Sequence, residues 1–407
     1  MKKIIFFSLG LMLLAKLSFA HYFSESYSNW VITDNKVSAT FTILKLEATR
    51  VLQIDSFQEI GEEKQLSEGE IFLEYFKPRI AVLESSKECE LEKQPSLIGG
   101  KDEYHTIEFA YLCVSDNSIK IINNVLFDIA QSHVHLSRIR MNNQIYEKAL
   151  FYNDQTILIN DLKITNKRSF IDSLNSFISS GITHILTGLD HLIFLLGLMI
   201  LVNNFRQLLI VITGFTLGHS ITLALVALNI VVPNTIMIEA LIGFTVLFIG
   251  AEYMIKEDKN FNSIVGILLS ILIIAAISSI FLEISISLIS ITALILITIG
   301  YFGILKNLEN KSFYRIIITS LFGLVHGFGF GTFLFNSQFD QKNTLSALFG
   351  FNLGVEMGQI IFLMVFVLTN LFLFRILSMK KYEYLMQGVM ILVTSLGFYW
   401  FIQRLYF

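Results

Sequence analysis

Hydrophobic and polar positions divide the chain into two parts. Between residues 21 and 165 the apolar residues come in short stretches, and in 37–43 and 107–113 they recur at every second position. Such alternation is typical of strands with one buried face. From residue 181 onward, apolar runs of about twenty residues dominate, which is the length a helix needs to cross a bilayer. The pattern predicts an all-β, sandwich-like domain at 21–165 and an all-α polytopic membrane domain at 181–407.

The C-terminal part contains eight apolar segments and is therefore expected to form about eight transmembrane helices: 181–202, 207–230, 235–254, 262–281, 285–305, 316–334, 346–374 and 383–403. Loops on one side carry nine Lys or Arg residues, whereas the other side carries only Lys342 and Arg404. Because basic residues accumulate in cytoplasmic loops, both ends of this domain are expected outside. An amphipathic linker helix at 166–180 is expected to lie at the interface.

The first twenty residues have the pattern of a signal peptide. Lys2 and Lys3 precede a short apolar run, and Ser18-Phe-Ala20 fits a cleavage site. Cleavage is expected after Ala20, and an uncleaved anchor is the alternative because Lys16 lies close to the site. In either case the 21–165 domain is expected to be exported. We therefore expect a multi-pass protein of the bacterial inner membrane with a periplasmic N-terminal domain. Both cysteines, Cys89 and Cys113, lie in that domain, and in an oxidising compartment they are expected to form a disulfide.

Composition narrows the function classes. Apolar residues make up 54% of the chain and charged residues only 15%, which argues against a wholly soluble enzyme. The charge balance also gives no indication of nucleic-acid binding. The exported domain is acidic, with a net charge of −6 over 21–170.

Two histidine features of the exported domain could carry chemistry. His133 and His135 would share one face of a strand and could bind one metal ion, although a partly exposed histidine pair is the simpler interpretation. His21 would chelate Cu²⁺ or Ni²⁺ through its ring and a free amine if cleavage occurs as expected.

Ionisable residues within the membrane segments are the main candidates for function. A charge in the bilayer interior costs at least about 2.5–3.5 kcal/mol, so such residues need a reason. No Lys or Arg is expected at the same depth as these residues. Glu252 lies near the inner end of its segment and is expected to be interfacial. The acids and imidazoles in the spans together predict a place where a cation or protons bind: Asp190, Glu239, Glu356, His184, His191, His219 and His326.

The spacing of these residues adds detail. His184 and His191 are about two helical turns apart and would share a face, with Asp190 as a ligand or an orienting group. Asn352, Glu356 and Gln359 form one polar stripe and are further candidate metal-site residues, with hydrogen bonding between helices as the alternative interpretation. The glycines at 323, 327 and 331 indicate either close helix packing or a helix break.

These motifs resemble those of the HupE/UreJ membrane proteins, in the branch with an exported N-terminal domain. The resemblance rests on four motifs within 175–405: His184-x5-Asp190-His191, Gly218-His219-Ser220, His326-Gly327 and Asn352-x-Gly-x-Glu356-x-Gly-Gln359. It implies nickel handling for hydrogenase or urease, with His184, Asp190 and His191 as the first metal-handling residues. His219, His326 and Glu356 are the second set that the resemblance implies. It also implies metalloenzyme maturation proteins as partners, besides the lipid bilayer.

The leading hypothesis is a permease whose substrate is a divalent metal ion, nickel or cobalt, with zinc or copper as alternatives. An intramembrane zinc-dependent hydrolase is the first competing interpretation, because three histidines and an aspartate can hold Zn²⁺ and activate water. A membrane-anchored assembly factor, whose exported domain binds a partner, is the second.

Overall fold

The computed structural model describes most of the chain beyond residue 24. The described residues are 25–33, 35–45, 48–49, 67–85, 87–98, 104–114, 119–129, 133–142, 144–150, 152, 154–159, 170–202, 204–228, 230–231, 234–257, 261–281, 287–305, 311–337 and 341–406. The expected signal peptide and His21 lie outside them. Contacts group His21–Asp172 into one compact unit and Ser173–Phe407 into another.

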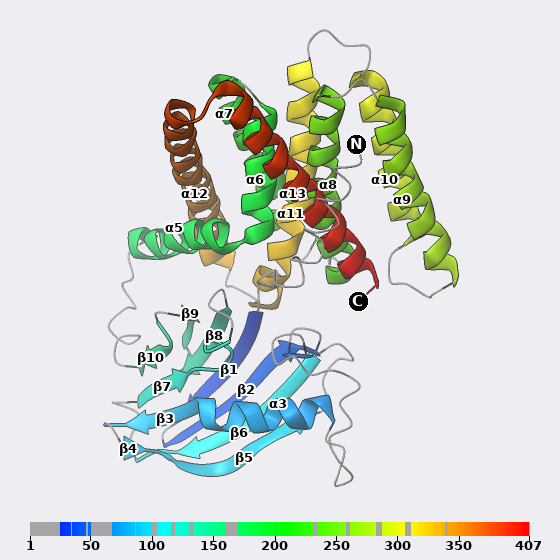
Figure 1. The fold of residues 1–407 in the computed structure, drawn as a ribbon. Helices are drawn as coiled ribbons and strands as arrows, with labels where there is room; N and C mark the ends of the chain where they lie inside the picture. The colour runs from blue at the N-terminus through cyan, green and yellow to red at the C-terminus, as the bar shows by residue number, and fades with distance from the viewer. Residues whose placement is uncertain are drawn as a thin grey trace. The chain divides into compact units, whose positions relative to one another are not determined.

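The N-terminal unit is the expected β-rich domain, built from two sheets (Figure 1). The six-stranded sheet has the order β5-β6-β2-β1-β8-β9, and the four-stranded sheet has the order β10-β7-β3-β4. All neighbours pair antiparallel except β1 and β8, which are parallel. The strands are β1 (Glu25–Thr33), β2 (Lys36–Leu44), β3 (Ile80–Glu84), β4 (Lys87–Glu88), β5 (Glu90–Ile98), β6 (Tyr104–Leu112), β7 (Ile119–Asn123), β8 (Val134–Met141), β9 (Gln144–Leu150) and β10 (Thr156–Leu158).

The alternating stretches of the sequence form the core of this domain. Val37, Phe41 and Phe109 are fully buried, and every second residue of β2 points inward. Helix α3 (Glu68–Phe76) begins at a capping box made by Ser67 and covers the core with its aromatic residues. The rings of Phe41 and Phe76 on α3 lie 5.0 Å apart, centroid to centroid. In Figure 1 this helix crosses the strands of the six-stranded sheet.

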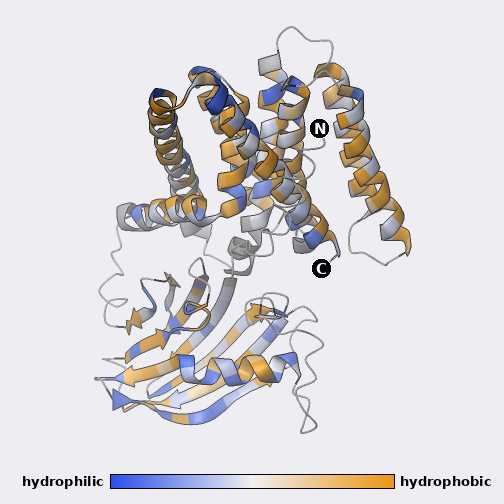
Figure 2. Cartoon of the chain, in the orientation of Figure 1, coloured by the Kyte–Doolittle hydropathy of each residue, from blue (hydrophilic) through white to orange (hydrophobic). Residues whose placement is uncertain are grey.

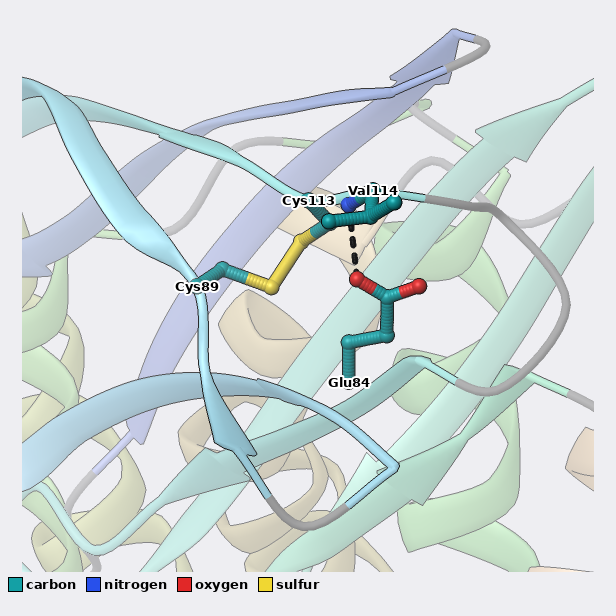
Figure 3. The surroundings of a disulfide bond; sticks show 4 residues. All are labelled: Glu84, Cys89, Cys113 and Val114. Carbon is teal, nitrogen blue, oxygen red and sulfur yellow. Dashed lines mark hydrogen bonds between the residues drawn. A yellow bond between two sulfur atoms is a disulfide. The ribbon is translucent and has the colours of Figure 1, made fainter.

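A disulfide joins Cys89 to Cys113, the two cysteines expected to pair, and their Cα atoms are 4.9 Å apart (Figure 3). Cys89 follows β4 and Cys113 follows β6, so the bond ties the start of β5 to the end of its neighbour. Beside it, the backbone N–H of Val114 donates a hydrogen bond of 2.6 Å to Oε2 of Glu84. The covalent link and this bond hold the end of β6 in place.

The C-terminal unit is all-helical. Its helices are α5 (Phe170–Thr187), α6 (Leu189–Leu201), α7 (Phe205–Ala227), α8 (Thr235–Glu257), α9 (Phe261–Phe281), α10 (Leu288–Leu305), α11 (Lys311–Ser337), α12 (Gln341–Ile376) and α13 (Met379–Tyr406). Six of them are long and apolar enough to cross a membrane, and α5 with α6, as one broken span, makes a seventh. The remaining segment, in α11, has a described apolar stretch of 17 residues, Phe313–Gly329. The unit is thus a multi-pass membrane domain, and its apolar colouring is strongest on α9 and α10 (Figure 2).

Glycines bring particular helices into backbone contact. A Cβ atom at Gly218 of α7 would lie 2.1 Å from the carbonyl oxygen of Ser320 on α11, and one at Gly323 would lie 2.0 Å from that of Phe215. A Cβ atom at Gly354 of α12 would lie 2.1 Å from the carbonyl oxygen of Ile178 on α5. Since α11 is one helix from Lys311 to Ser337, a helix break is not seen, and Gly323 and Gly327 serve close packing.

Candidate metal site

The first span is broken at Gly188. Helices α5 and α6 meet there at an angle of 72°, so the expectation of a straight helix with two histidines on one face is wrong. The residue must be small, because a Cβ atom at Gly188 would lie 2.9 Å from Nδ1 of His191 and 3.0 Å from the carbonyl oxygen of His184. The linker and the first histidine also share a helix, since α5 runs from Phe170 to Thr187. The bend brings the rings of His184 and His191 to 4.9 Å between centroids.

Four buried histidines from four helices meet next to this bend. His184 lies on α5, His191 on α6, His219 on α7 and His326 on α11, and none is more than 6% exposed. The ring centroids of His191 and His326 are 4.9 Å apart, and that of His219 lies 6.1 Å from His184 and 6.3 Å from His191. We call these four residues the histidine cluster. The sequence named all four, but their meeting depends on helix packing.

The orientation of His191 is set by its neighbour. Nδ1 of His191 is 2.9 Å from Oδ1 of Asp190. A carboxylate can only accept, so Nδ1 carries the hydrogen and Nε2 keeps its lone pair. Within the described residues Nε2 is buried and makes no hydrogen bond. This is the carboxylate–histidine arrangement that orients many metal ligands, and it gives Asp190 the role of a supporting group.

His326 is oriented in a similar way by a hydroxyl. The Thr245 hydroxyl donates to the carbonyl oxygen of Ile242 at 2.7 Å, so it accepts from Nε2 of His326 at 2.9 Å. The lone pair of His326 is then on Nδ1, a buried atom with no hydrogen bond among the described residues. The oxygen of Thr245 on α8 therefore fixes the tautomer of a ring on α11.

His219 makes no hydrogen bond with either ring nitrogen in the described part of the chain, although it is fully buried. Its position follows from the close approach of α7 and α11, since a Cβ atom at Gly327 would lie 2.3 Å from the His219 carbonyl oxygen. The neighbouring Ser220 donates its hydroxyl back to the carbonyl oxygen of Thr216 at 2.7 Å. That hydroxyl is thus engaged within its own helix, as expected for serine in a span.

An arginine near Asp190 and Glu239 was not expected from the sequence. Nη2 of Arg404 on α13 lies 3.4 Å from Oδ2 of Asp190, and Nη1 donates to the carbonyl oxygen of Glu239 at 3.0 Å. Arg404 is 5% exposed and lies within α13, so its assignment to a tail after the last helix is wrong. The sequence held one indication that Arg404 belongs to the helix, because Trp400 precedes it by one helical turn. In the structure the guanidinium carbon lies over the Trp400 ring, 5.6 Å from its centroid.

Glu252, which the sequence placed near the interface, is also paired with a buried arginine. Arg315 donates from Nη2 and Nε to Oε1 of Glu252, at 2.6 and 3.0 Å, and Tyr301 donates to Oε2 at 2.9 Å. Glu252 is 1% exposed and Arg315 is 9% exposed. Because single buried charges are costly, the two residues compensate each other inside the helical unit.

The polar stripe of α12 faces α7 and does not join the histidine cluster by any described hydrogen bond. Thr213 donates to Oε1 of Glu356 at 3.1 Å, and Thr216 donates to Oε1 of Gln359 at 2.8 Å. Asn352 donates to the carbonyl oxygen of Leu348 in its own helix. The alternative interpretation, hydrogen bonding between helices, thus describes Glu356 and Gln359.

The histidine pair of the exported domain is fully buried, so the expectation of partial exposure is wrong. His133 is 1% exposed and His135 is 0% exposed. Ser26 Oγ bonds both rings, at 2.9 Å to Nε2 of His133 and 2.6 Å to Nδ1 of His135, and Ser28 Oγ lies 2.7 Å from Nε2 of His135. Burial and the nearby His133 hold the pKa of His135 well below its ordinary value. Its two nitrogens are taken by serines, which leaves His135 no position for a metal ion.

Among the described residues, no three His, Cys, Asp or Glu side chains are yet arranged as ligands of one metal ion. The rings of the histidine cluster lie close together, but several of them would have to rotate before their nitrogens could bind one metal ion. His191, His219 and His326 each offer a buried nitrogen without a hydrogen bond among the described residues. Imidazole nitrogen is a common ligand of Zn, Cu, Fe and Ni ions.

Comparison with known proteins gives the same family as the sequence motifs. A family model described as HupE / UreJ protein matches residues 160–276 and 270–404. No curated protein sequence matches the chain. The matched regions make up more than half of the chain and include every helix that contributes to the histidine cluster. The chain therefore belongs to the HupE/UreJ family of membrane proteins.

Proposed function

We propose that this protein is a permease for a divalent transition metal ion, nickel or cobalt, and that the histidine cluster binds the ion on its way across the membrane. The family is of the nickel/cobalt transporter type. The observation that carries the proposal is the pair of buried nitrogens with defined lone pairs, on His191 and His326, within a group of four histidines. Few structural roles require four imidazoles in contact inside a membrane domain.

The charges around the cluster fit a transient stop for a cation. Asp190 is balanced by Arg404, so its carboxylate supports His191 and adds little net charge. Neutral imidazoles would then be the main ligands, and a divalent ion leaves such a set more readily than one with uncompensated carboxylates. Entry would be favoured by the membrane potential, at about 2.3 kcal/mol per charge per 100 mV.

The proposed orientation follows the distribution of basic residues. The ends of α6 and α8 and the start of α7 and α11, which we call the inner end, would face the cytoplasm of a bacterial cell. The N-terminal unit would then be periplasmic. Partner proteins that mature metalloenzymes would receive the ion on the cytoplasmic side.

Metal accumulation in cells tests the proposal. Ni²⁺, Co²⁺, Cu²⁺ and Zn²⁺ are measured by elemental analysis in uptake-deficient cells that express the wild type, His191→Ala or His105→Gln at equal membrane abundance. We expect one metal to accumulate in the wild type and in His105→Gln, a histidine of the exported domain, and not in His191→Ala. Equal metal content in wild-type and empty cells, with the protein correctly inserted, would contradict the proposal.

A further inference from the structure

A layer of phenylalanines lies one helical turn from the histidine cluster, toward the inner end. On α6 it is Phe194, three residues after His191. On α7 and α11 it is Phe215 and Phe322, each four residues before its histidine. On α8, Phe248 lies three residues after Thr245, the partner of His326. Since three or four residues make one turn, all four helices place a phenylalanine at the same depth, about 5 Å from the histidines.

These rings touch one another across the four helices. The centroids of Phe194 and Phe215 are 5.1 Å apart, those of Phe194 and Phe322 are 6.0 Å apart, and those of Phe248 and Phe322 are 5.2 Å apart. The layer also contacts the cluster directly, because the ring of His326 lies 5.2 Å from Phe194 and 5.1 Å from Phe215. All four phenylalanines are at most 5% exposed. We call them the phenylalanine layer.

A polar cavity lies beyond this layer. It measures about 350 Å³ and is lined by residues that include Leu201, Asn204, Gln207, Glu252, Lys256 and Arg315. These residues come from the same four helices, α6, α7, α8 and α11, or from the link between α6 and α7, and Leu305 at the end of α10 completes the lining. They lie one to two further turns toward the inner end. Glu252 is held by Arg315 and Tyr301, so the cavity is aqueous space and not a second metal site.

We infer that α6, α7, α8 and α11 enclose the permeation path and that the phenylalanine layer is its selectivity barrier, between the histidine cluster and the polar cavity. The inference rests on the proposed function for the identity of the ion. The path has three levels in order: imidazoles that bind the ion, aromatic rings that exclude water, and a polar cavity that receives the ion.

The physical basis is the cost of an apolar constriction. Hydrated ions and water do not pass rings in contact, and such constrictions close pores by dewetting. A metal ion held by His326 has already exchanged water for nitrogen ligands, and it is already beside Phe194 and Phe215. The layer would therefore admit an ion delivered by the cluster when the helices separate, and would hold back protons and hydrated ions at other times.

Cysteine labelling tests the barrier without any transport assay. The chain has two cysteines, both in the Cys89–Cys113 disulfide, so an introduced cysteine is the one free thiol. Gln207→Cys reports on the cavity, and Thr245→Cys reports on the level of the cluster. Inside-out vesicles are treated with a membrane-impermeant cationic methanethiosulfonate. We expect modification of Gln207→Cys and protection of Thr245→Cys.

Removing a ring should abolish the protection. Phe215→Ala in the Thr245→Cys background should raise the modification rate about tenfold, because the constriction is widened by a whole aromatic ring. Phe194→Ala is the second variant, in case the first does not fold. Phe401→Ala is the matched control, because that ring is equally buried but packs on Phe244, outside the layer.

The outcomes separate this inference from the proposed function. Protection of Thr245→Cys that is lost in Phe215→Ala or Phe194→Ala, and kept in Phe401→Ala, supports the barrier even if no metal accumulates. Rapid modification of Thr245→Cys with all rings present, or protection that survives both ring deletions, overturns it even if the wild type imports nickel. A cysteine at 207 that does not react also overturns it, because the cavity would then not be open to water.

Discussion

Replacing Arg404 by methionine tests the electrostatic support of the histidine cluster. Arg404 is 5% exposed. Its Nη2 lies 3.4 Å from Oδ2 of Asp190, and its Nη1 donates to the carbonyl oxygen of Glu239 at 3.0 Å. Methionine preserves much of the side-chain volume but removes the positive charge. The carboxylate of Asp190 then stays in the protein interior with His191 as its described partner.

The expected cost follows from the geometry. Removing one partner of a fully buried ion pair costs about 3–5 kcal/mol, because the other charge is left uncompensated. Two features reduce this figure: the Arg404–Asp190 distance is long for an ion pair, and the side chain of Asp190 remains 20% exposed. We therefore expect Arg404→Met to lower the free energy of unfolding by about 2–3 kcal/mol.

A double-mutant cycle identifies the source of this loss. The free energy of unfolding is measured by denaturant titration in mixed micelles for Arg404→Met, Asp190→Asn and the double variant. If the charge of Asp190 is the cause, the loss in the free energy of unfolding of the double variant is about 1–2 kcal/mol smaller than the sum of the two single losses. The control is Arg375→Met, which replaces an exposed arginine on α12.

The reasoning would be refuted by simple additivity. If the two single changes add within about 0.5 kcal/mol, Arg404 and Asp190 do not interact energetically and the 3.4 Å contact carries no weight. A second test is metal affinity, since the loss of groups that orient a ligating histidine reduces affinity about 10–100-fold. Unchanged affinity in Arg404→Met and Asp190→Asn would remove Asp190 from the site.

Three further predictions concern packing, pH and the disulfide. Gly218→Val should abolish the folded membrane domain, because its Cβ would meet a backbone oxygen at 2.1 Å, whereas Gly266→Ala, with nothing within 4 Å, should keep wild-type yield in size-exclusion chromatography. The exported domain should lose stability as the pH falls below about 6.5, because His135 gains a proton more readily in the unfolded chain, and hydrogen exchange of β8 should show this dependence weakened in His135→Gln. Replacing Cys89 and Cys113 together by serine should destabilise that domain by about 3 kcal/mol, measured by exchange of the β5 and β6 amides, and an unchanged exchange rate would contradict this estimate.

Local patterns in the sequence predicted what depends on neighbours along the chain. Alternation at 37–43 and 107–113 gave strands with buried faces, and the apolar runs gave the helices of the membrane domain. The four histidines of the cluster could be named because an imidazole in an apolar run needs a reason. These inferences succeed since strand faces and helix lengths are set by residues close in sequence.

What the sequence could not provide depends on which helices pack together. Arg315 and Arg404 lie near helix ends and were counted as loop charges, but each reaches inward to an acid on another helix. The bend at Gly188 was missed because a straight apolar run was assumed. The burial of His135 was missed for the same reason, since Ser26 and Ser28, which satisfy its ring, belong to a strand more than a hundred residues away.

The glycine contacts limit how the membrane domain can move. Where Gly218 and Gly323 hold α7 against α11, and Gly354 holds α12 against α5, a slide of one residue would bring a side chain into a neighbouring backbone. Each pair is therefore a single mechanical element. Any change that opens a route through the domain has to rotate or separate such pairs as rigid units, and the broken joint at Gly188 is a place where one of them can pivot.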